Sequence, residues 1–215
     1  MLRSVRGLYA IVDWDFLAAR GCAPLPFLER LLVARPAAVQ LRAKSSSARA
    51  TLQLARSMAA CCRAAGVPFF VNDRPDLALL SGSVGVHLGQ HDLSLPDAHR
   101  VGPALQLGVS THRLEEVESA LVERPHYLAF GPVFATASKR DPEPVVGLDG
   151  LAAAAQRCRR ARIALVAIGG IDEARAAQVA ATADAGAVIS ALLPAGGLSE
   201  VTATARRLHS ALGGS

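Results

Sequence analysis

Residues 68–89 read PFFVNDRPDLALLSGSVGVHLG, and this stretch predicts one complete strand–helix–strand unit. Two short apolar runs, at 68–73 and 84–89, flank a helix-like segment at 75–81. Short continuous apolar runs of this kind are typical of parallel strands, which are buried on both faces. Asp73 ends the first run, so the unit also places an acidic group where a strand ends.

The same unit repeats along the whole chain. Further apolar runs lie at 7–13, 37–42, 105–110, 127–133, 164–169 and 185–190, and the other helical segments lie near 26–34, 47–65, 95–100, 113–122, 149–160, 172–181 and 198–212. Eight strands alternating with eight helices predict the α/β class and a closed (β/α)₈ or TIM barrel. A doubly wound open sheet is the alternative, but eight near-equal units favour closure. Because no linker or composition shift interrupts the pattern, we expect residues 1–215 to form a single domain.

The amino-acid composition limits the kinds of ligand that this chain is expected to bind. Half of the residues are apolar and 19% are charged, which excludes a disordered or fibrous chain. The net charge of +5 accompanies only 4% aromatic residues and no basic run of five, so we expect small anionic ligands rather than nucleic acid. No apolar run approaches the length of about 18 residues that a membrane span needs. The four cysteines form no CxxC pair, which predicts reduced thiols and a cytoplasmic location.

Polar residues gather at the predicted strand ends. In a barrel of this kind functional groups lie at the carboxyl ends of the strands, which meet at one mouth. Seven predicted strands contribute polar or glycine residues there: Gln40, Arg42, Lys44, Asn72, Asp73, Asp92, Ser110, Lys139, Gly170 and Ser190. The sequence therefore predicts one shared site.

Asp73 and Asp92 end consecutive predicted strands and are expected to bind Mg²⁺ together. Hard Mg²⁺ takes one or two carboxylates and completes its shell with phosphate oxygens, which Arg42, Lys44 and Lys139 would help to neutralise. Either aspartate alone could instead cap a helix, and the two basic residues of the second strand could instead form a structural salt bridge. The set as a whole predicts a site for a magnesium-bound diphosphate.

A second phosphate site is expected beside the first. Gly170 and the pair Ile189-Ser190 follow the seventh and eighth predicted strands, whose loops commonly bind phosphate through backbone N–H groups. Thr136 and Ser138 offer hydroxyl groups in the loop that also carries Lys139. Tight turns and an ordinary exposed loop are the alternatives. His87 lies within a strand and is expected in the core, while two other histidines, His91 and His112, are weak candidates near the mouth.

Seven ordered blocks of this sequence resemble the thiamine-phosphate synthase family, also called thiamin phosphate pyrophosphorylase. They are VQLRxK at 39–44, VNDR at 71–74, GVHLGQxDL at 85–93, GVSTH at 108–112, FGPVFxTxSK at 130–139, AIGGI at 167–171 and VISA at 188–191. The match runs over nearly the whole chain. Ala43 stands where the family usually has an acidic residue, and Ser138 replaces a common threonine but keeps the hydroxyl group.

The resemblance implies a Mg²⁺-dependent transferase that joins two small phosphorylated molecules. An aminopyrimidine that carries a methylene diphosphate loses diphosphate, and the nitrogen of hydroxyethylthiazole phosphate captures the resulting carbocation to give thiamine phosphate. By matching position, the catalytic residues are Arg42, Lys44, Ser110 and Lys139, which hold the diphosphate donor together with Gln40 and Asn72. Asp73 and Asp92 match the metal ligands. The residues that match the binding site of the thiazole phosphate are Thr136, Ser138, Gly170, Ile189 and Ser190.

Two other functions remain open at this point. A thiazole tautomerase shares the barrel, but it tends to have a histidine where Pro132 stands and to lack the full acidic pair. A non-catalytic paralogue that binds thiamine intermediates would need less of the leaving-group apparatus. The sequence leaves the oligomeric state open, with a homodimer as one option.

Overall fold

Eight parallel strands close into a barrel. The computed structural model describes residues 6–136, 143–193, 195 and 197–214, and its strands are β1 Gly7–Asp13, β2 Ala38–Arg42, β3 Phe69–Asn72, β4 Gly85–Leu88, β5 Gln106–Thr111, β6 Tyr127–Phe130, β7 Ala164–Ala167 and β8 Ala185–Val188. Each strand pairs in parallel with the next, and β8 pairs with β1 from Ala185 opposite Gly7 onward. The predicted closed barrel is therefore confirmed, and the open sheet is excluded.

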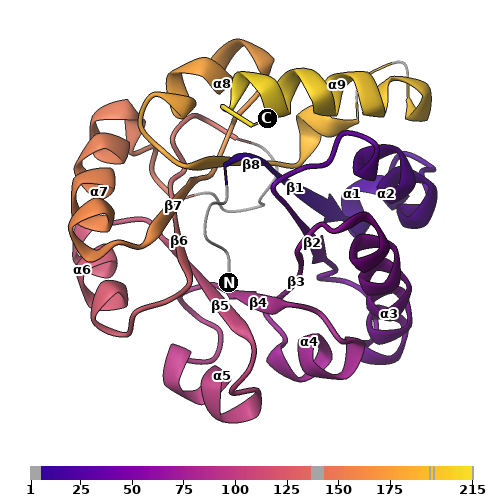
Figure 1. Cartoon of the computed structure of the whole chain (residues 1–215), viewed down its shortest axis with the longest axis horizontal. Coiled ribbons are helices and arrows are strands. Elements are labelled where there is room, and N and C mark those ends of the chain that lie inside the picture. The colour runs from indigo at the N-terminus through magenta and orange to yellow at the C-terminus, as the bar shows by residue number, and fades with distance from the viewer. Residues whose placement is uncertain (1–5, 137–142, 194, 196, 215) are drawn as a thin grey trace.

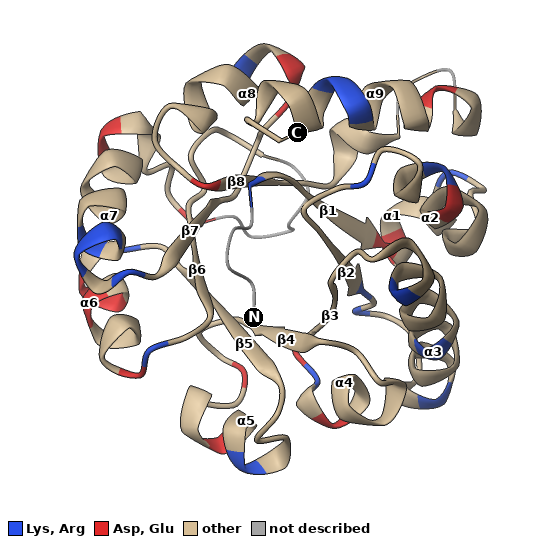
Figure 2. Cartoon of the chain, viewed as in Figure 1, with Lys and Arg blue, Asp and Glu red and all other residues tan. Residues whose placement is uncertain are grey.

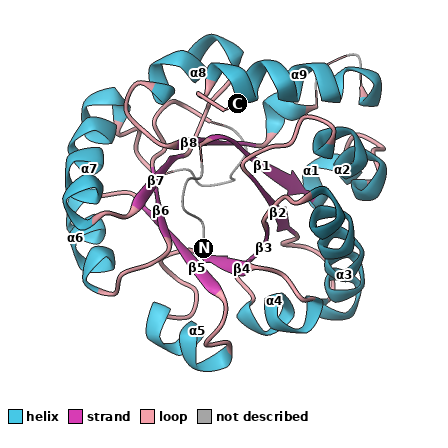
Figure 3. Ribbon diagram, in the orientation of Figure 1, coloured by secondary structure: helices cyan, strands magenta, loops and turns pink. Residues whose placement is uncertain are grey.

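Helices form an outer ring around the strands (Figures 1 and 3). They are α1 Trp14–Ala18, α2 Pro24–Leu32, α3 Ala48–Ala65, α4 Pro75–Ser81, α5 Leu95–Val101, α6 Leu114–Val122, α7 Gly147–Ala161, α8 Glu173–Ala180 and α9 Leu198–Ala211, with a short 3₁₀ helix, η1, at Ser190–Leu192. Each of the eight predicted helices is present. The sequence analysis did not predict α1 or η1.

Local signals set the helix ends. Ser47 caps α3 by accepting a hydrogen bond from the N–H group of Ala50, and Gly66 ends the helix in the left-handed conformation. Proline occupies the first turn of α2, α4 and α5, where its missing N–H costs nothing. These caps explain why the helical pattern was readable in the sequence.

Several strands end before their apolar runs do. The run at 127–133 was predicted as one strand, but β6 stops at Phe130. Pro132 follows and has no N–H group to donate to a neighbouring strand. Likewise β4, β7 and β8 end one or two residues early, so Gly89 and Gly169 lie in the loops beyond the strands and Ser190 begins η1. The shortened strands leave these residues at the mouth of the barrel.

Three aromatic rings fill the inside of the barrel on the amino-terminal side of the mouth. The rings of Tyr9, Phe70 and Tyr127 are fully buried, and their centroids lie 5.5–6.0 Å apart. Gly85 and Gly108 make room for them, because a Cβ atom on Gly108 would lie 2.1 Å from Cζ of Tyr127. The large rings thus fit beside small residues on neighbouring strands, and the barrel has a solid floor.

A larger apolar layer joins the strands to the helices. Leu8, Val12, Leu128 and many aliphatic residues from the inner faces of the helices form this layer. On the outer ring, charged residues of both signs are spread over the helices (Figure 2). Across the described ranges, no helix has the length and apolarity that crossing a membrane requires.

The fit between Gly108 and Tyr127 is testable through stability. We expect Gly108→Ala to lower the free energy of unfolding by about 1–3 kcal/mol, because the added methyl group overlaps the tyrosine ring. Urea denaturation measures this loss. The double variant Gly108→Ala/Tyr127→Val lacks the overlapping ring. Its loss in unfolding free energy should therefore be smaller than the sum of the losses in the two single variants. Strict additivity would contradict the assigned overlap.

Candidate active site

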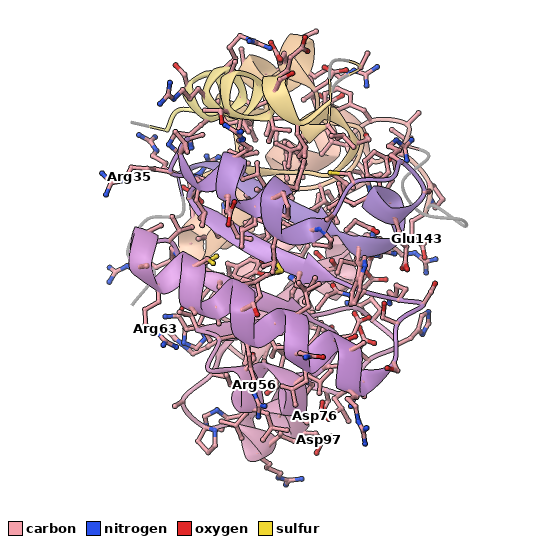
Figure 4. The ribbon with its side chains drawn as sticks, turned by 90° about the vertical axis from the view of Figure 1, so that its right-hand side faces the viewer. Arg35, Arg56, Arg63, Asp76, Asp97 and Glu143 are labelled. Atoms are coloured by element: carbon pink, nitrogen blue, oxygen red, sulfur yellow. The ribbon has the colours of Figure 1, made fainter. Side chains whose placement is uncertain are left out.

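A cavity of about 560 Å³ lies where the strands end. Its walls include each predicted site residue that the structure describes: Gln40, Arg42, Lys44, Asn72, Asp73, Asp92, Ser110, Thr136, Gly170, Ile189 and Ser190. Ser138 and Lys139 fall outside the described residues. Glu143, which the sequence analysis missed, also lines the cavity and lies at the opposite end of the barrel from Arg35 and Arg63 (Figure 4). The cavity has the size typical of small-molecule sites.

Asp73 lies just beyond β3 and faces two charged neighbours. Its φ of 65° places it in the left-handed region, and its N–H group donates to the carbonyl oxygen of His87 at 2.7 Å. Nζ of Lys44 lies 2.5 Å from Asp73 Oδ2. Burial raises the pKa of Asp73; Lys44 opposes this shift, and the carboxylate of Asp92 adds to it. A second cation between the carboxylates would relieve their repulsion.

Asp92 is held by the turn that follows β4. Its Oδ2 accepts a hydrogen bond from the N–H group of Gly89 at 2.7 Å. The residue that caps α5 is Ser94, and α4 has no side-chain cap. The helix-cap alternative for Asp73 and Asp92 is therefore excluded, and both carboxylates line the cavity.

The donor set fits magnesium. Within the described ranges, no cluster of three or more His, Cys, Asp or Glu side chains could enclose a metal ion. Two hard carboxylate oxygens without histidine or thiolate suit Mg²⁺, which commonly keeps waters and takes phosphate oxygens from its substrate. Asp73 and Asp92 are thus the residues that would hold this ion.

The short helix α1 supports the cationic wall of the site. Asp13 is only 3% exposed; one of its oxygens accepts from the N–H group of Phe16 at 3.0 Å, and the other pairs with Arg42. Asp15 accepts hydrogen bonds from the N–H groups of Lys44 and Ser45 at 3.0 and 3.2 Å. Both aspartates were missed by the sequence analysis, although they follow directly on the first apolar run.

The structure refines the prediction for the second strand. Arg42 forms the structural ion pair that the sequence analysis named as the alternative, and it also lines the cavity. Lys44 was counted among the basic residues of the second strand, which is wrong because β2 ends at Arg42. The turn held by Asp15, rather than strand geometry, brings Lys44 to the mouth.

A row of buried polar side chains crosses the floor of the cavity. Nε2 of Gln40 donates to the hydroxyl oxygen of Tyr9 at 3.1 Å, and this hydroxyl lies 2.7 Å from that of Tyr127. His87 contacts the Tyr127 hydroxyl through Nδ1 and Ser110 Oγ through Nε2, both at 2.8 Å. Burial raises the pKa of both tyrosines, so they remain neutral phenols.

This row confirms one prediction, extends it and adds residues. His87 was expected in the core, and it is buried, but it also lines the cavity. The sequence analysis missed Tyr9 and Tyr127. The sequence feature that could have identified them is the hydroxyl group, because a tyrosine within a buried strand needs a hydrogen-bond partner.

The two histidines expected near the mouth do line the cavity. Nδ1 of His112 lies 2.5 Å from the carbonyl oxygen of Gly131, and its backbone N–H donates to Glu116. His91 lies in the β4–α5 loop, next to Asp92. Neither residue joins a described metal cluster.

The loops after β7 and β8 form the remaining wall. Gly169 and Gly170 have φ values of 92° and 65°, and a Cβ atom on Gly170 would lie 2.4 Å from the carbonyl oxygen of Ala135. Only glycine lets this loop pack so closely on the loop after β6. Ser190 begins η1 and Ile189 precedes it, and N–H groups at the start of a helix can bind an anion.

Part of the cavity wall is apolar. Ile11, Ala129, Val166, Ile168 and Ala187 come from four strands and the turn after β7. The cavity therefore combines a charged mouth with a less polar interior. An elongated ligand with an anionic end and a flat organic end matches this distribution.

Comparison with known proteins agrees with the geometry. A family model described as thiamine monophosphate synthase matches residues 8–192. The thiamine-phosphate synthase of Chloroflexus aurantiacus is 41% identical over 206 residues, 93% of each chain, and that of Methanocella arvoryzae is 42% identical over 203 residues, 94% of this chain and 92% of the relative.

A solved structure shows the same arrangement of the chain. The thiamine phosphate pyrophosphorylase from Pyrococcus furiosus superposes with a TM-score of 0.82 at 30% identity, over 99% of this chain and 98% of that one. Sequence and fold therefore agree over the full barrel. This chain belongs to the thiamine monophosphate synthase family.

Proposed function

We propose that this chain is a thiamine-phosphate synthase that condenses 4-amino-2-methyl-5-hydroxymethylpyrimidine diphosphate with hydroxyethylthiazole phosphate. The observation that carries the proposal is the group formed by Lys44, Asp73 and Asp92 at the mouth of a cavity with an apolar wall. The names of the relatives point to the same reaction. The chain would act in the cytoplasm as one catalytic domain of residues 1–215, without nucleic acid.

The diphosphate donor would occupy the half of the cavity lined by β2 to β5. Asp73 and Asp92 would hold Mg²⁺, and Arg42 and Lys44 would neutralise further phosphate oxygens. Gln40, Asn72 and Ser110 would supply neutral hydrogen bonds. Lys139 is assigned to the leaving diphosphate from the sequence resemblance alone.

The reaction needs no proton transfer. The carbon–oxygen bond to diphosphate breaks and its electron pair leaves with the oxygen; the thiazole nitrogen then supplies the pair for the new carbon–nitrogen bond. Bound Mg²⁺ would supply positive charge that stabilises the departing diphosphate. The fixed cations Arg42 and Lys44 would act in the same direction, since preorganised charge stabilises charge that develops in a transition state. Apolar walls such as Val166 and Ala187 would keep water from the carbocation.

The thiazole phosphate would bind on the other side of the cavity. Gly170 lines the cavity and would present its backbone to the anion, and Ser190 would add the start of η1 with Ile189 before it. Thr136 lines the same cavity and would donate its hydroxyl group. Ser138 is assigned to this phosphate from the resemblance alone.

The two alternatives make different demands. A tautomerase would act on a single phosphorylated substrate without metal, and the paired carboxylates Asp73 and Asp92 have no part in that reaction. In addition, Pro132 offers no imidazole at the position where such enzymes tend to have histidine. A binding paralogue would form no product at saturating substrate.

The function is tested by a reconstitution assay. We expect thiamine phosphate to form only when the pyrimidine diphosphate, the thiazole phosphate and Mg²⁺ are all present, and we expect EDTA to stop it reversibly. Chromatographic detection of thiamine phosphate measures the outcome. Turnover that persists after metal removal would favour the tautomerase instead. Turnover of the thiazole phosphate without the pyrimidine diphosphate would do the same.

The metal assignment is tested by neutralising the carboxylates. We expect Asp73→Asn and Asp92→Asn each to lower kcat/KM by about 100-fold or more, because the shell loses a charged ligand. Asparagine is the suitable replacement at position 73, since it tolerates the positive φ of 65°. Asp76→Asn is the matched control, because its exposed carboxylate pairs with Arg74 and does not line the cavity. Equal losses in the three variants would refute the assignment.

The division into two phosphate sites is tested by Gly170→Ala. The added Cβ atom would displace the loop, so we expect the KM for the thiazole phosphate to rise about 10-fold, or about 1.4 kcal/mol, with little change for the pyrimidine diphosphate. Gly197→Ala controls for backbone strain, because Gly197 has a φ of 71° and open space around its Cβ position. A parallel rise in both KM values would argue against separate sites.

A further inference from the structure

The buried row beneath the cavity contains groups that the proposed reaction does not use directly. Tyr9, Tyr127 and His87 link Gln40 on β2 to Ser110 on β5 through four hydrogen bonds of 2.7–3.1 Å. Most of these contacts join groups that can either donate or accept. The direction of each bond therefore depends on its neighbours.

Gln40 fixes the direction at one end. Its Nε2 atom has hydrogens and no lone pair to offer, so the Tyr9 oxygen accepts this bond. The hydroxyl hydrogen of Tyr9 then has the Tyr127 oxygen as its acceptor at 2.7 Å. Both tyrosines are about 1% exposed, so an unused phenolic hydrogen would be costly.

The direction passes from Tyr127 to the imidazole ring. Because the Tyr127 oxygen accepts from Tyr9, its own hydrogen donates to Nδ1 of His87 at 2.8 Å. Nδ1 must then be unprotonated, and the ring hydrogen sits on Nε2. A doubly protonated ring would donate from both nitrogens and leave one of the two phenolic hydrogens without an acceptor.

We propose that this row locks His87 as the neutral Nε2–H tautomer and thereby leaves the hydroxyl hydrogen of Ser110 to donate to a ligand in the cavity. Nε2–H donates to Ser110 Oγ at 2.8 Å, so the serine hydrogen is available to a ligand. Tyr9, Tyr127 and His87 are positioning residues that act through Ser110. Ser110 is fixed further, because Nε2 of Gln90 donates to its carbonyl oxygen at 2.6 Å.

The consequence for ligand choice rests on the proposed function. Because His87 donates to it, Ser110 keeps its own hydrogen for an acceptor, such as an anionic phosphate oxygen of the diphosphate. In the reverse arrangement Ser110 would donate to His87, and no serine hydrogen would remain for the phosphate.

The tautomer can be measured directly in the ligand-free protein. We would label the histidines with ¹⁵N and record long-range ¹H–¹⁵N correlation spectra at neutral pH, assigning His87 by its loss in His87→Gln. Two other histidines provide internal references. Nδ1 of His126 accepts from the N–H group of Leu107, so it is unprotonated, whereas Nδ1 of His112 faces the Gly131 carbonyl and must be protonated.

We expect His87 to give the pattern of His126, with a single unprotonated Nδ1. A pattern like that of His112, a doubly protonated ring or an average of the two tautomers would overturn the proposal. The wild-type spectrum alone decides this point, so the result does not depend on any variant folding. Because no substrate is present, failure here is distinguishable from failure of the proposed reaction.

A matched pair of variants tests the cause of the lock. Tyr127→Phe removes the donor to Nδ1, and we expect the His87 signals to shift toward an average of the two tautomers. Tyr9→Phe also removes one phenolic hydroxyl, but from the residue before Tyr127 in the row. The Tyr127 hydrogen still has Nδ1 of His87 as its acceptor, so the wild-type pattern of His87 signals should persist. An unchanged His87 spectrum in Tyr127→Phe would show that the row does not set the tautomer.

Discussion

Closure of eight short strands around a solid aromatic floor is the constraint on which the site depends. Tyr9, Phe70 and Tyr127 fill the barrel interior, and the cavity lies above them where the strands end. Residues from distant parts of the chain therefore meet around one cavity. The glycines at positions 85 and 108 are part of this constraint, because side chains there would overlap the rings or neighbouring backbone.

The charged groups at the mouth are arranged in pairs that a ligand would rearrange. Arg42 is already neutralised by the buried Asp13, whereas Lys44 and Asp73 contact each other in a more exposed position. A magnesium diphosphate would satisfy both members of the second pair, since the metal binds the carboxylate and the phosphate binds the ammonium group. The site thus keeps its charges partly compensated before the ligand arrives, which limits the cost of holding them near apolar walls.

The predictable features were those encoded by short-range patterns. The eight strands and eight helices followed from apolar runs, and the strand-end rule brought residues such as Asp73, Asp92 and Ser190 to one cavity. The helix α1 was missed because five residues are too few to show a helical period. Asp13, which caps this helix, and Asp15 within it thus escaped notice although they hold the second strand and its turn.

The buried hydrogen-bond row was out of reach for a different reason. Tyr9, His87 and Tyr127 lie on β1, β4 and β6, and their contacts exist only once the barrel has closed. No local sequence pattern specifies which of several inward-facing side chains will contact each other. The position of Lys44 was likewise set by a turn contact to Asp15 rather than by strand alternation.

Calorimetric titration with inorganic diphosphate would test the central claim most directly, because it isolates the mouth of the cavity from the rest of the reaction. If Asp73, Asp92 and Lys44 form a magnesium–diphosphate site, diphosphate should bind with one-to-one stoichiometry in the presence of Mg²⁺ and much more weakly in EDTA. Equally tight binding with and without the metal would contradict this account of the carboxylate pair.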